Sequence, residues 1–320
     1  MTQRAEPSRR ELLISGTAIL GRALAVTVPS SAAARDPELP WIDAHSHIWP
    51  GEVDRYPLAP GLTKNDLKPA SFTDEELLAV AKPEGVGRVV LIQHSIYHLF
   101  DNSYLLDAVK RHPKRFRIQG MVDDHQPGSG AKMKTLLRQG VTGFRITPFI
   151  RKPGEQARWL ETPGMQEMWK TGAETGQAMC LLINPGDLPA TIAMCERHPE
   201  TPVVIDHFAR IGADGVIRDA DVEQLCRLAR KKHTYVKLSA FYALGKKRPP
   251  YDDLVPMIRK LLDAYGPERL MWASDAPYQL EKGQGYRPSI ALIRDRLDFL
   301  GPGDREKLLA KTAETVFFSQ

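Results

Sequence analysis

The chain of 320 residues has only three cysteines, Cys180, Cys195 and Cys226, and their spacing matches no zinc-binding or redox motif. An odd number of cysteines cannot pair completely within one chain, so a framework of structural disulfides is disfavoured. After the N-terminal region, no run approaches the roughly 20 apolar residues that a membrane-spanning helix needs. We therefore expect a mature protein without a membrane span.

Basic residues do not gather into a long block, although the formal net charge is +5. The sequence also contains no nucleic-acid-binding motif. Both absences predict a mildly basic surface and no nucleic-acid partner. What is present is a composition of 42% hydrophobic and 26% charged residues, which suits a globular enzyme with a sizeable core.

The N-terminal residues 1–34 resemble a twin-arginine export signal. The pair Arg9 and Arg10 precedes an apolar stretch over residues 12–28, and the alanines at 32–34 suit a signal peptidase. Arg22 interrupts the apolar stretch, which leaves a disordered extension as the alternative.

The resemblance to an export signal implies two parts of the chain. Residues 1–34 form the signal and residues 35–320 form one catalytic domain, with the mature chain starting near Arg35. The partners implied are the twin-arginine export machinery and a small-molecule substrate, and the location implied is the periplasm.

The rest of the chain alternates short β-rich runs with longer amphipathic runs. The eight β-rich runs are Trp41–Ile48, Arg88–Ser95, Phe116–Val122, Gly143–Thr147, Ala178–Asn184, Pro202–His207, Thr234–Ser239 and Leu270–Ser274. Several are almost entirely apolar, as parallel strands buried on both faces are. Eight β–α units predict a single-domain (β/α)₈ TIM barrel. The alternative, a doubly wound open sheet, often carries a Gly-rich phosphate turn after its first strand, which this chain lacks.

Helix boundaries are also visible in the sequence. The run from Thr73 to Glu76 has the capping-box pattern, and Asp187 and Asp221 are candidate caps of later helices. The segment from Pro50 to Ser71 is rich in Pro and Gly, and we expect it to cover the top of the barrel.

Polar residues stand where several strands end, and in a TIM barrel these ends build the active site. His45 and His47 are two residues apart, so they share one face of the first strand and can converge on one metal ion or one substrate group. His207 ends the sixth strand as a further ligand or a donor to a carbonyl. Asp275 follows the eighth strand and can take a proton from an attacking water and return it to the leaving group.

Other polar residues near strand ends carry weaker signals. His94 and His125 follow the second and third strands, and a loop or core role is favoured for both. Lys237 and Ser239 lie on the seventh strand.

Four motifs carry a resemblance to the amidohydrolase superfamily. They are Trp41–Trp49, Gly143-Phe144-Arg145, Ile205–Phe208 and Trp272–Asp275. The amidohydrolase-related branch that includes 2-pyrone-4,6-dicarboxylate lactonase and sugar-acid lactonases is the most similar. The resemblance implies a barrel hydrolase in which water attacks an ester, lactone or amide carbonyl.

The resemblance also implies roles for individual residues. His45 and His47 match a metal-binding pair, His207 matches the sixth-strand histidine, and Asp275 matches the aspartate that activates water. Arg145 stands where related lactonases hold a substrate carboxylate, a task suited to a bidentate guanidinium, although a salt bridge at the barrel rim is equally consistent with it.

The chain departs from the binuclear members of the superfamily. These carry a bridging lysine on strand 4 and a histidine on strand 5, whereas this chain has Arg145 and Asn184 there. One Zn²⁺ held by His45, His47 and Asp275, with His207 as a further ligand, therefore remains open. A metal-free site whose histidines polarise the carbonyl remains open as well.

The favoured function is hydrolysis of a carboxylic ester or lactone whose substrate carries a carboxylate or a sugar-acid ring. Trp49 and Tyr278 are candidate aromatic walls for such a ring. The alternatives are a metal-dependent decarboxylase or an amide hydrolase on the same barrel, and a non-catalytic binding protein.

Overall fold

The computed structural model of the protein describes residues 39–152 and 155–319. The proposed export signal over residues 1–34 lies outside this range and is not tested by the structure. Among the described residues, no helix combines the length and the apolar character needed to cross a bilayer.

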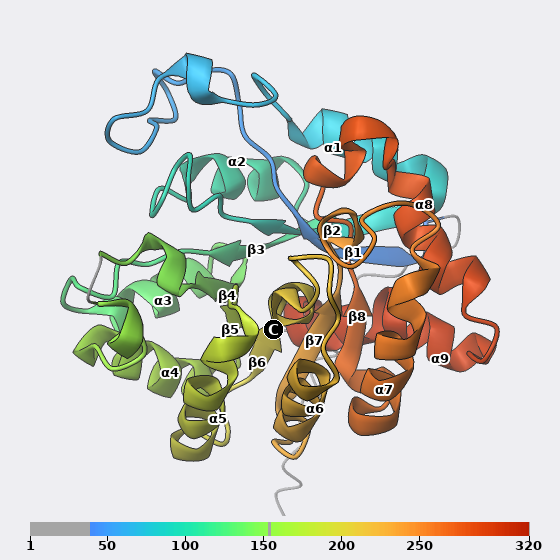
Figure 1. Ribbon diagram of the computed structural model, residues 1–320. Coiled ribbons are helices and arrows are strands. Elements are labelled where there is room, and N and C mark those ends of the chain that lie inside the picture. The colour runs from blue at the N-terminus through green and yellow to red at the C-terminus, as the bar shows by residue number, and fades with distance from the viewer. Residues whose placement is uncertain (1–38, 153–154, 320) are drawn as a thin grey trace, which may run out of the picture. The chain divides into compact units, whose positions relative to one another are not determined.

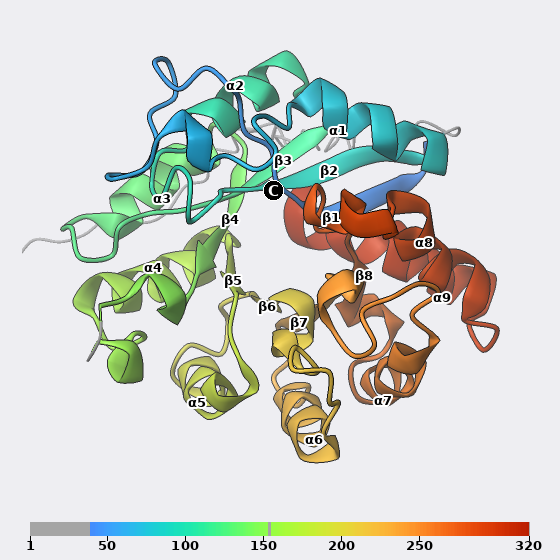
Figure 2. The same cartoon turned by 45° about the horizontal axis from the view of Figure 1, so that its top comes forward.

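Eight parallel strands form one sheet, and each strand pairs with the next one along the chain. The strands are β1 (Trp41–Ser46), β2 (Val86–Ile92), β3 (Phe116–Gly120), β4 (Val141–Ile146), β5 (Ala178–Leu181), β6 (Val203–Ile205), β7 (Thr234–Leu238) and β8 (Leu270–Trp272). Figures 1 and 2 show this sheet curled into a ring with the helices outside it. The architecture fits a TIM barrel, as the alternation of β-rich and amphipathic runs predicted.

A helix follows every strand, and one more helix lies near the C-terminus. The helices are α1 (Asp74–Ala81), α2 (Ser103–Arg111), α3 (Ser129–Leu137), α4 (Pro163–Thr175), α5 (Leu188–Arg197), α6 (Asp219–Leu228), α7 (Val255–Tyr265), α8 (Tyr286–Ala291) and α9 (Pro302–Glu306). Their apolar faces pack on the outward residues of the strands in one large buried cluster.

Apolar side chains from alternate strand positions form a second cluster inside the barrel. Ile42 and Ala44 of β1 belong to it, as does Cys180 of β5, which is core filler as expected. The C-terminal segment adds further side chains, including that of Phe317. The barrel interior is therefore filled, and the polar residues concentrate toward the other end of the strands.

All eight strands lie where the sequence predicts them, but several end earlier. β6 stops at Ile205, before Asp206 and His207, and β8 stops at Trp272, before Asp275. His207 and Asp275 have positive φ angles of 52° and 64°. A left-handed backbone at a non-glycine residue costs roughly 1–3 kcal/mol and is typical of functional sites. The chain thus leaves the sheet where these two side chains turn toward the barrel mouth.

The helix boundaries confirm part of the sequence analysis. Thr73 caps α1, because its Oγ1 accepts from the Glu76 amide at 3.3 Å while Glu76 accepts from the Thr73 amide at 2.6 Å. Asp187 precedes α5, but its carboxylate accepts from the Asn184 amide instead of capping α5. Asp221 is wrong as a cap, because α6 already begins at Asp219 and Asp221 is its third residue.

The segment from Pro50 to Ser71 packs on the loop after β2. The amide of Ala59 donates to the Tyr97 carbonyl at 2.7 Å, and His98 Nδ1 lies 3.0 Å from the Pro57 carbonyl. Trp49 and Phe72 pair their backbones at the two ends of this segment. Its position on a loop at the C-terminal end of the strands agrees with the expectation that it covers that end of the barrel.

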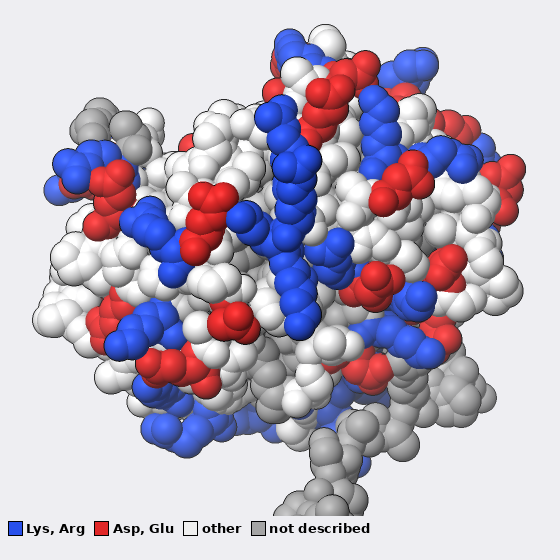
Figure 3. All heavy atoms as spheres, turned by 90° about the horizontal axis from the view of Figure 1, so that it is seen from below, with Lys and Arg blue, Asp and Glu red and all other residues white. Residues whose placement is uncertain are grey.

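Charges of both signs share the protein surface. Figure 3 shows basic and acidic side chains interspersed over one face, with a short row of basic side chains near its centre. Ion pairs such as Lys231–Glu196 and Lys260–Asp219 join side chains of opposite charge in the described chain. The absence of a nucleic-acid partner stays a prediction from sequence.

Asp43 joins the last strand to the first. Its buried carboxylate accepts from the Ser274 amide at 2.9 Å, from the Tyr286 hydroxyl at 2.8 Å and from the hydroxyls of Ser46 and Ser274. The backbone adds bonds from the Asp275 amide to the His45 carbonyl and from the His47 amide to the Ala276 carbonyl, both at 2.8 Å. These bonds position the candidate catalytic residues of β1 and β8 against each other.

We expect Asp43→Asn to lower the free energy of unfolding by about 2–4 kcal/mol, because the amide nitrogen cannot accept from buried donors. Urea denaturation measures the change. Tyr286→Phe is the control, and it should cost only about 1 kcal/mol because it removes a single hydrogen bond to the same carboxylate. Equal losses in the two variants would show that Asp43 does not organise the closure.

Candidate active site

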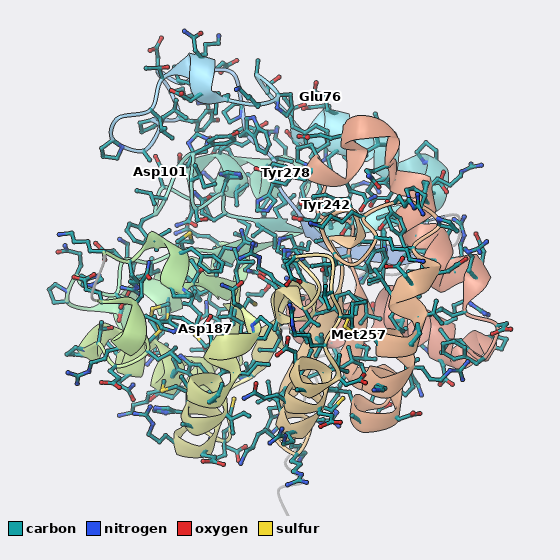
Figure 4. All side chains as sticks on the ribbon, viewed as in Figure 1. Glu76, Asp101, Asp187, Tyr242, Met257 and Tyr278 are labelled. Carbon is teal, nitrogen blue, oxygen red and sulfur yellow. The ribbon has the colours of Figure 1, made fainter. Side chains whose placement is uncertain are left out.

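A cavity of about 320 Å³ opens at the C-terminal ends of the strands. It is lined by His47, His94, Ser95, Ile96, Arg145, Phe149, Leu182, His207, Arg210, Ala240, Tyr242, Ala243, Asp275 and Tyr278. Figure 4 labels Tyr242 and Tyr278, which come from the loops after β7 and β8. The cavity lies where a TIM barrel carries its active site.

Three of the four residues singled out at strand ends, His47, His207 and Asp275, line this cavity, and the fourth, His45, is fully buried against Asp275. Asp275 Oδ1 lies 3.4 Å from His45 Nε2 and 3.4 Å from His47 Nε2, and Asp275 Oδ2 lies 3.9 Å from His207 Nε2. The ring centroids of His45 and His207 are 4.5 Å apart. One carboxylate therefore faces three imidazoles, two from β1 and its end and one from the end of β6.

The hydrogen bond of His47 shows where its proton lies. His47 Nδ1 is 3.1 Å from the carbonyl of Ile92, which can only accept, so this nitrogen carries the proton and Nε2 presents its lone pair to Asp275. His45 differs, because Lys237 Nζ lies 3.2 Å and Asp206 Oδ1 3.5 Å from its Nδ1 while Arg145 Nη2 lies 2.9 Å from its Nε2, so these contacts do not assign its tautomer. Asp275 Oδ1 is buried and has no hydrogen-bond partner among the described residues.

The lone pair of His47 Nε2 and the unpartnered oxygen Asp275 Oδ1 face each other, and ligands of this kind suit a cation. The ligand atoms of His45, His207 and Asp275 lie within 4.8 Å of one another. The site is therefore consistent with one divalent metal. His47, which the sequence analysis placed among the ligands, lies next to this group, with its Nε2 3.4 Å from Asp275 Oδ1.

Burial dominates the protonation of the site. Desolvation holds the pKa values of His45 and His47 well below the usual histidine range, and it also lowers the pKa of His207. Desolvation raises the pKa of Asp275, while His207, Tyr242 and Arg145 act in the opposite direction. Neutral imidazoles are the form that can bind a metal ion.

A buried charged cluster lies beneath the histidines, and the sequence analysis assigned it no role. Lys237 Nζ is 3.0 Å from Asp206 Oδ1 and donates to Gln119 Oε1 at 2.6 Å. The side chains of Lys237 and Asp206 are fully buried. Burial would raise the pKa of Asp206, but Lys237, followed by His45 and Arg145, outweighs it and holds that pKa well below its usual range.

Arg145 forms an ion pair and also lines the cavity, so its substrate-binding role stays a prediction. Its Nη2 lies 3.5 Å from Asp206 Oδ2 and 2.9 Å from His45 Nε2, and the residue also lines the cavity. Its Nε is buried without a hydrogen-bond partner among the described residues. Arg145 is therefore anchored by Asp206 and retains donor capacity for an anion.

Two further contacts could not be found from the sequence. The Tyr242 hydroxyl donates to Asp275 Oδ2 at 2.8 Å, and the Ser239 hydroxyl lies 2.8 Å from His207 Nδ1. Tyr242 follows β7 without any strand-end pattern that marks it. Both side chains orient a candidate catalytic group.

The two aromatic residues proposed as walls have different positions. Tyr278 lines the cavity, and His94, for which a loop or core role was favoured, lines it as well. Trp49 is fully buried, and its Nε1 donates to the Pro69 carbonyl at 2.9 Å. Its ring packs behind those of His94 and Tyr278, with centroids 5.3 and 6.2 Å away. Trp49 thus supports the wall and is not itself part of the cavity lining.

An eight-stranded parallel barrel with histidines and an aspartate at its C-terminal end defines a class of hydrolytic barrel enzymes. The chain belongs to the amidohydrolase family, because the family model described as Amidohydrolase matches residues 42–318. The resemblance seen in the four sequence motifs is confirmed, and the protein is a hydrolase of this family.

Two relatives carry the names of lactone hydrolases. The chain is 29% identical over 238 residues to 4-sulfomuconolactone hydrolase of Rhizobium radiobacter, covering 74% of this chain and 75% of the relative. It is 28% identical over 276 residues to L-fucono-1,5-lactonase of Burkholderia ambifaria, and this match covers 85% of this chain and 93% of the relative.

A solved structure shares the fold. An amidohydrolase from Burkholderia multivorans with bound zinc superposes with a TM-score of 0.72 at 20% identity, covering 87% of this chain and 99% of that one.

Proposed function

We propose that this protein hydrolyses the carbonyl of a lactone or other carboxylic ester whose substrate carries a carboxylate or a sugar-acid ring. The observation that carries the proposal is the single carboxylate of Asp275, which faces three imidazoles at a cavity that is also lined by Arg145. The names of the two lactone-hydrolysing relatives support the same reaction class.

Asp275 is the proposed general base. Tyr242 and His207 face its Oδ2, which leaves Oδ1 without a hydrogen-bond partner among the described residues and available to accept a proton from water. The water oxygen then attacks the carbonyl carbon, the carbon–oxygen bond of the lactone breaks, and Asp275 returns the proton to the leaving oxygen. Where no metal is bound, His207, held by Ser239, would instead donate to the carbonyl oxygen as charge develops on it.

Arg145 and Arg210 are the proposed contacts for a negatively charged substrate. Both line the cavity, and Arg210 also lies over the Phe149 ring with 4.9 Å between the guanidinium carbon and the ring centroid. A guanidinium matches a carboxylate with two parallel hydrogen bonds.

One divalent metal, with zinc as the first candidate, is proposed to be held by His45, His47 and Asp275, with His207 as a further ligand. When bound, such an ion polarises a carbonyl and lowers the pKa of water. Asp206 takes part indirectly, because its carboxylate lies 3.5 Å from His45 Nδ1, and Arg145 Nη2, 2.9 Å from His45 Nε2, would have to give up this contact when an ion binds there.

Location is a separate part of the proposal. The twin-arginine pattern supports export through that machinery and a periplasmic mature protein starting near Arg35. Fractionation of cells that produce the full chain, followed by N-terminal sequencing, tests this. A cytoplasmic protein that keeps residues 1–34 would contradict it.

The reaction is tested by proton release from sugar lactones, pyrone carboxylates and simple esters, with the chain starting at Arg35. Turnover of at least one lactone supports the proposal. Evolution of CO₂ from an aromatic carboxylate without lactone turnover would support the decarboxylase alternative, and release of ammonia or amine from amides would support the amide hydrolase.

Removal of metal from the same preparation is expected to lower the rate of lactone turnover by about 10²-fold or more, because several kcal/mol of charge stabilisation is lost. Prolonged dialysis against a chelator, followed by measurement of metal content and rate, checks this, and Zn²⁺ should restore the rate. Full turnover at zero metal content would instead support hydrolysis by the histidines and Asp275 alone.

A further inference from the structure

His94 is held with one defined tautomer in the cavity wall. The backbone amide of Tyr97 donates to His94 Nδ1 at 3.0 Å, and the Tyr97 ring stacks on the imidazole with centroids 4.1 Å apart. A backbone amide can only donate, so Nδ1 is the acceptor and the proton of the neutral ring lies on Nε2. Burial lowers the pKa of His94 well below its usual range, which agrees with a neutral ring.

The tautomer of His94 determines the role of the Tyr278 hydroxyl. His94 Nε2 hydrogen-bonds Tyr278 Oη, and because Nε2 carries the proton, the phenolic oxygen is the acceptor. The phenolic proton then needs another acceptor, and no side chain or carbonyl in the described part of the chain provides one. The Tyr242 hydroxyl differs, since its proton is used in the bond to Asp275.

The position of Tyr278 directs this spare donor into the cavity. Its ring is backed by Trp49 and packs edge-on against His47, with 5.8 Å between the centroids of the two rings. Tyr278 lines the same cavity as Asp275 and Arg145. A substrate oxygen in the cavity is the acceptor that this arrangement lacks.

We infer that Tyr278, oriented by His94, is a specificity-determining residue that donates a hydrogen bond to an oxygen substituent of the substrate. The site then selects lactones that carry a hydroxyl or oxo oxygen beside the wall formed by the loops after β2 and β8. A partly buried donor without a partner penalises an analogue that lacks this oxygen. The inference rests on the proposed hydrolase function and adds a feature of its substrate.

A set of matched substrates tests the inference. We would measure kcat/KM for a hexono-1,5-lactone and for its analogues that each lack one hydroxyl, with the wild type and Tyr278→Phe. In the wild type, one deoxy analogue should be poorer by roughly 10²-fold. Tyr278→Phe should lower kcat/KM for the parent lactone but not for that analogue. In this variant the kcat/KM values of the parent lactone and the analogue should therefore differ by no more than about threefold.

Two more variants separate specificity from structure. Tyr251→Phe is the control, because Tyr251 is buried and its hydroxyl bonds Gln284 at 2.8 Å outside the cavity lining, so the preference should remain. His94→Phe keeps a ring beside Tyr97 but removes Nε2, and it should reduce the preference by about 3- to 10-fold. An equal loss for every lactone in Tyr278→Phe would indicate a structural role and overturn the inference.

The tautomer can be measured without turnover. Long-range ¹H–¹⁵N correlation spectra of the histidine side chains, with His94→Phe for assignment, should show a protonated Nε2 and an unprotonated Nδ1. The opposite tautomer would overturn the inference. A wild type that hydrolyses no lactone at all would contradict the proposed function instead. The measured tautomer of His94 would still test whether the Tyr278 hydroxyl is a free donor.

Discussion

Replacement of Asp275 by Asn is expected to lower kcat for lactone hydrolysis by about 10²–10⁴-fold, the range that a positioned general base contributes. The amide keeps the shape and the hydrogen bond from Tyr242, 2.8 Å in the wild type, but it cannot accept a proton from water. Initial-rate measurements at saturating lactone check this. Asp219→Asn is the control, because the Asp219 side chain is 81% exposed and lies outside the cavity lining.

Asp275 is itself one of the proposed metal ligands, so the metal content of the variant must be measured with its rate. A slow variant with wild-type metal content and unchanged affinity for the hydroxy-acid product supports the base role. A variant that keeps the full rate would contradict the mechanism. A wild type that binds lactones without turning them over would indicate the binding-protein alternative.

Lys237→Met is expected to lower the free energy of unfolding by about 3–5 kcal/mol, since it leaves the buried Asp206 without its ammonium partner. The two groups are 3.0 Å apart and both side chains are fully buried. Urea denaturation gives the change. The exposed pair Lys260–Asp219 supplies the control, and Lys260→Met should cost about 1 kcal/mol or less.

The double variant Lys237→Met/Asp206→Asn keeps this prediction testable if the single variant does not fold. Removal of both charges should recover a large part of the loss, with a coupling of roughly 1–3 kcal/mol between the two sites. Additive losses would show that Lys237 stabilises the barrel by packing rather than through Asp206.

The sequence by itself determined the fold class and the order of the strands. Runs such as Val89-Val90-Leu91-Ile92 are apolar at every position, as strands buried on both faces are, and the structure has β2 there. The spacing of His45 and His47 identified one face of β1, because side chains alternate along a strand. The barrel rule then placed His207 and Asp275 at the same end.

Only the tertiary structure decided which polar side chains act together. Lys237 reads in the sequence as one more strand residue, and its ion pair with Asp206 depends on the register in which β7 pairs with the neighbouring β6, which no local pattern records. Trp49 has the same aromatic character as Tyr278, yet one is buried and the other faces the cavity. Local patterns record periodicity along the chain, whereas these contacts depend on distances across it, and the closing of eight strands into a ring sets those distances.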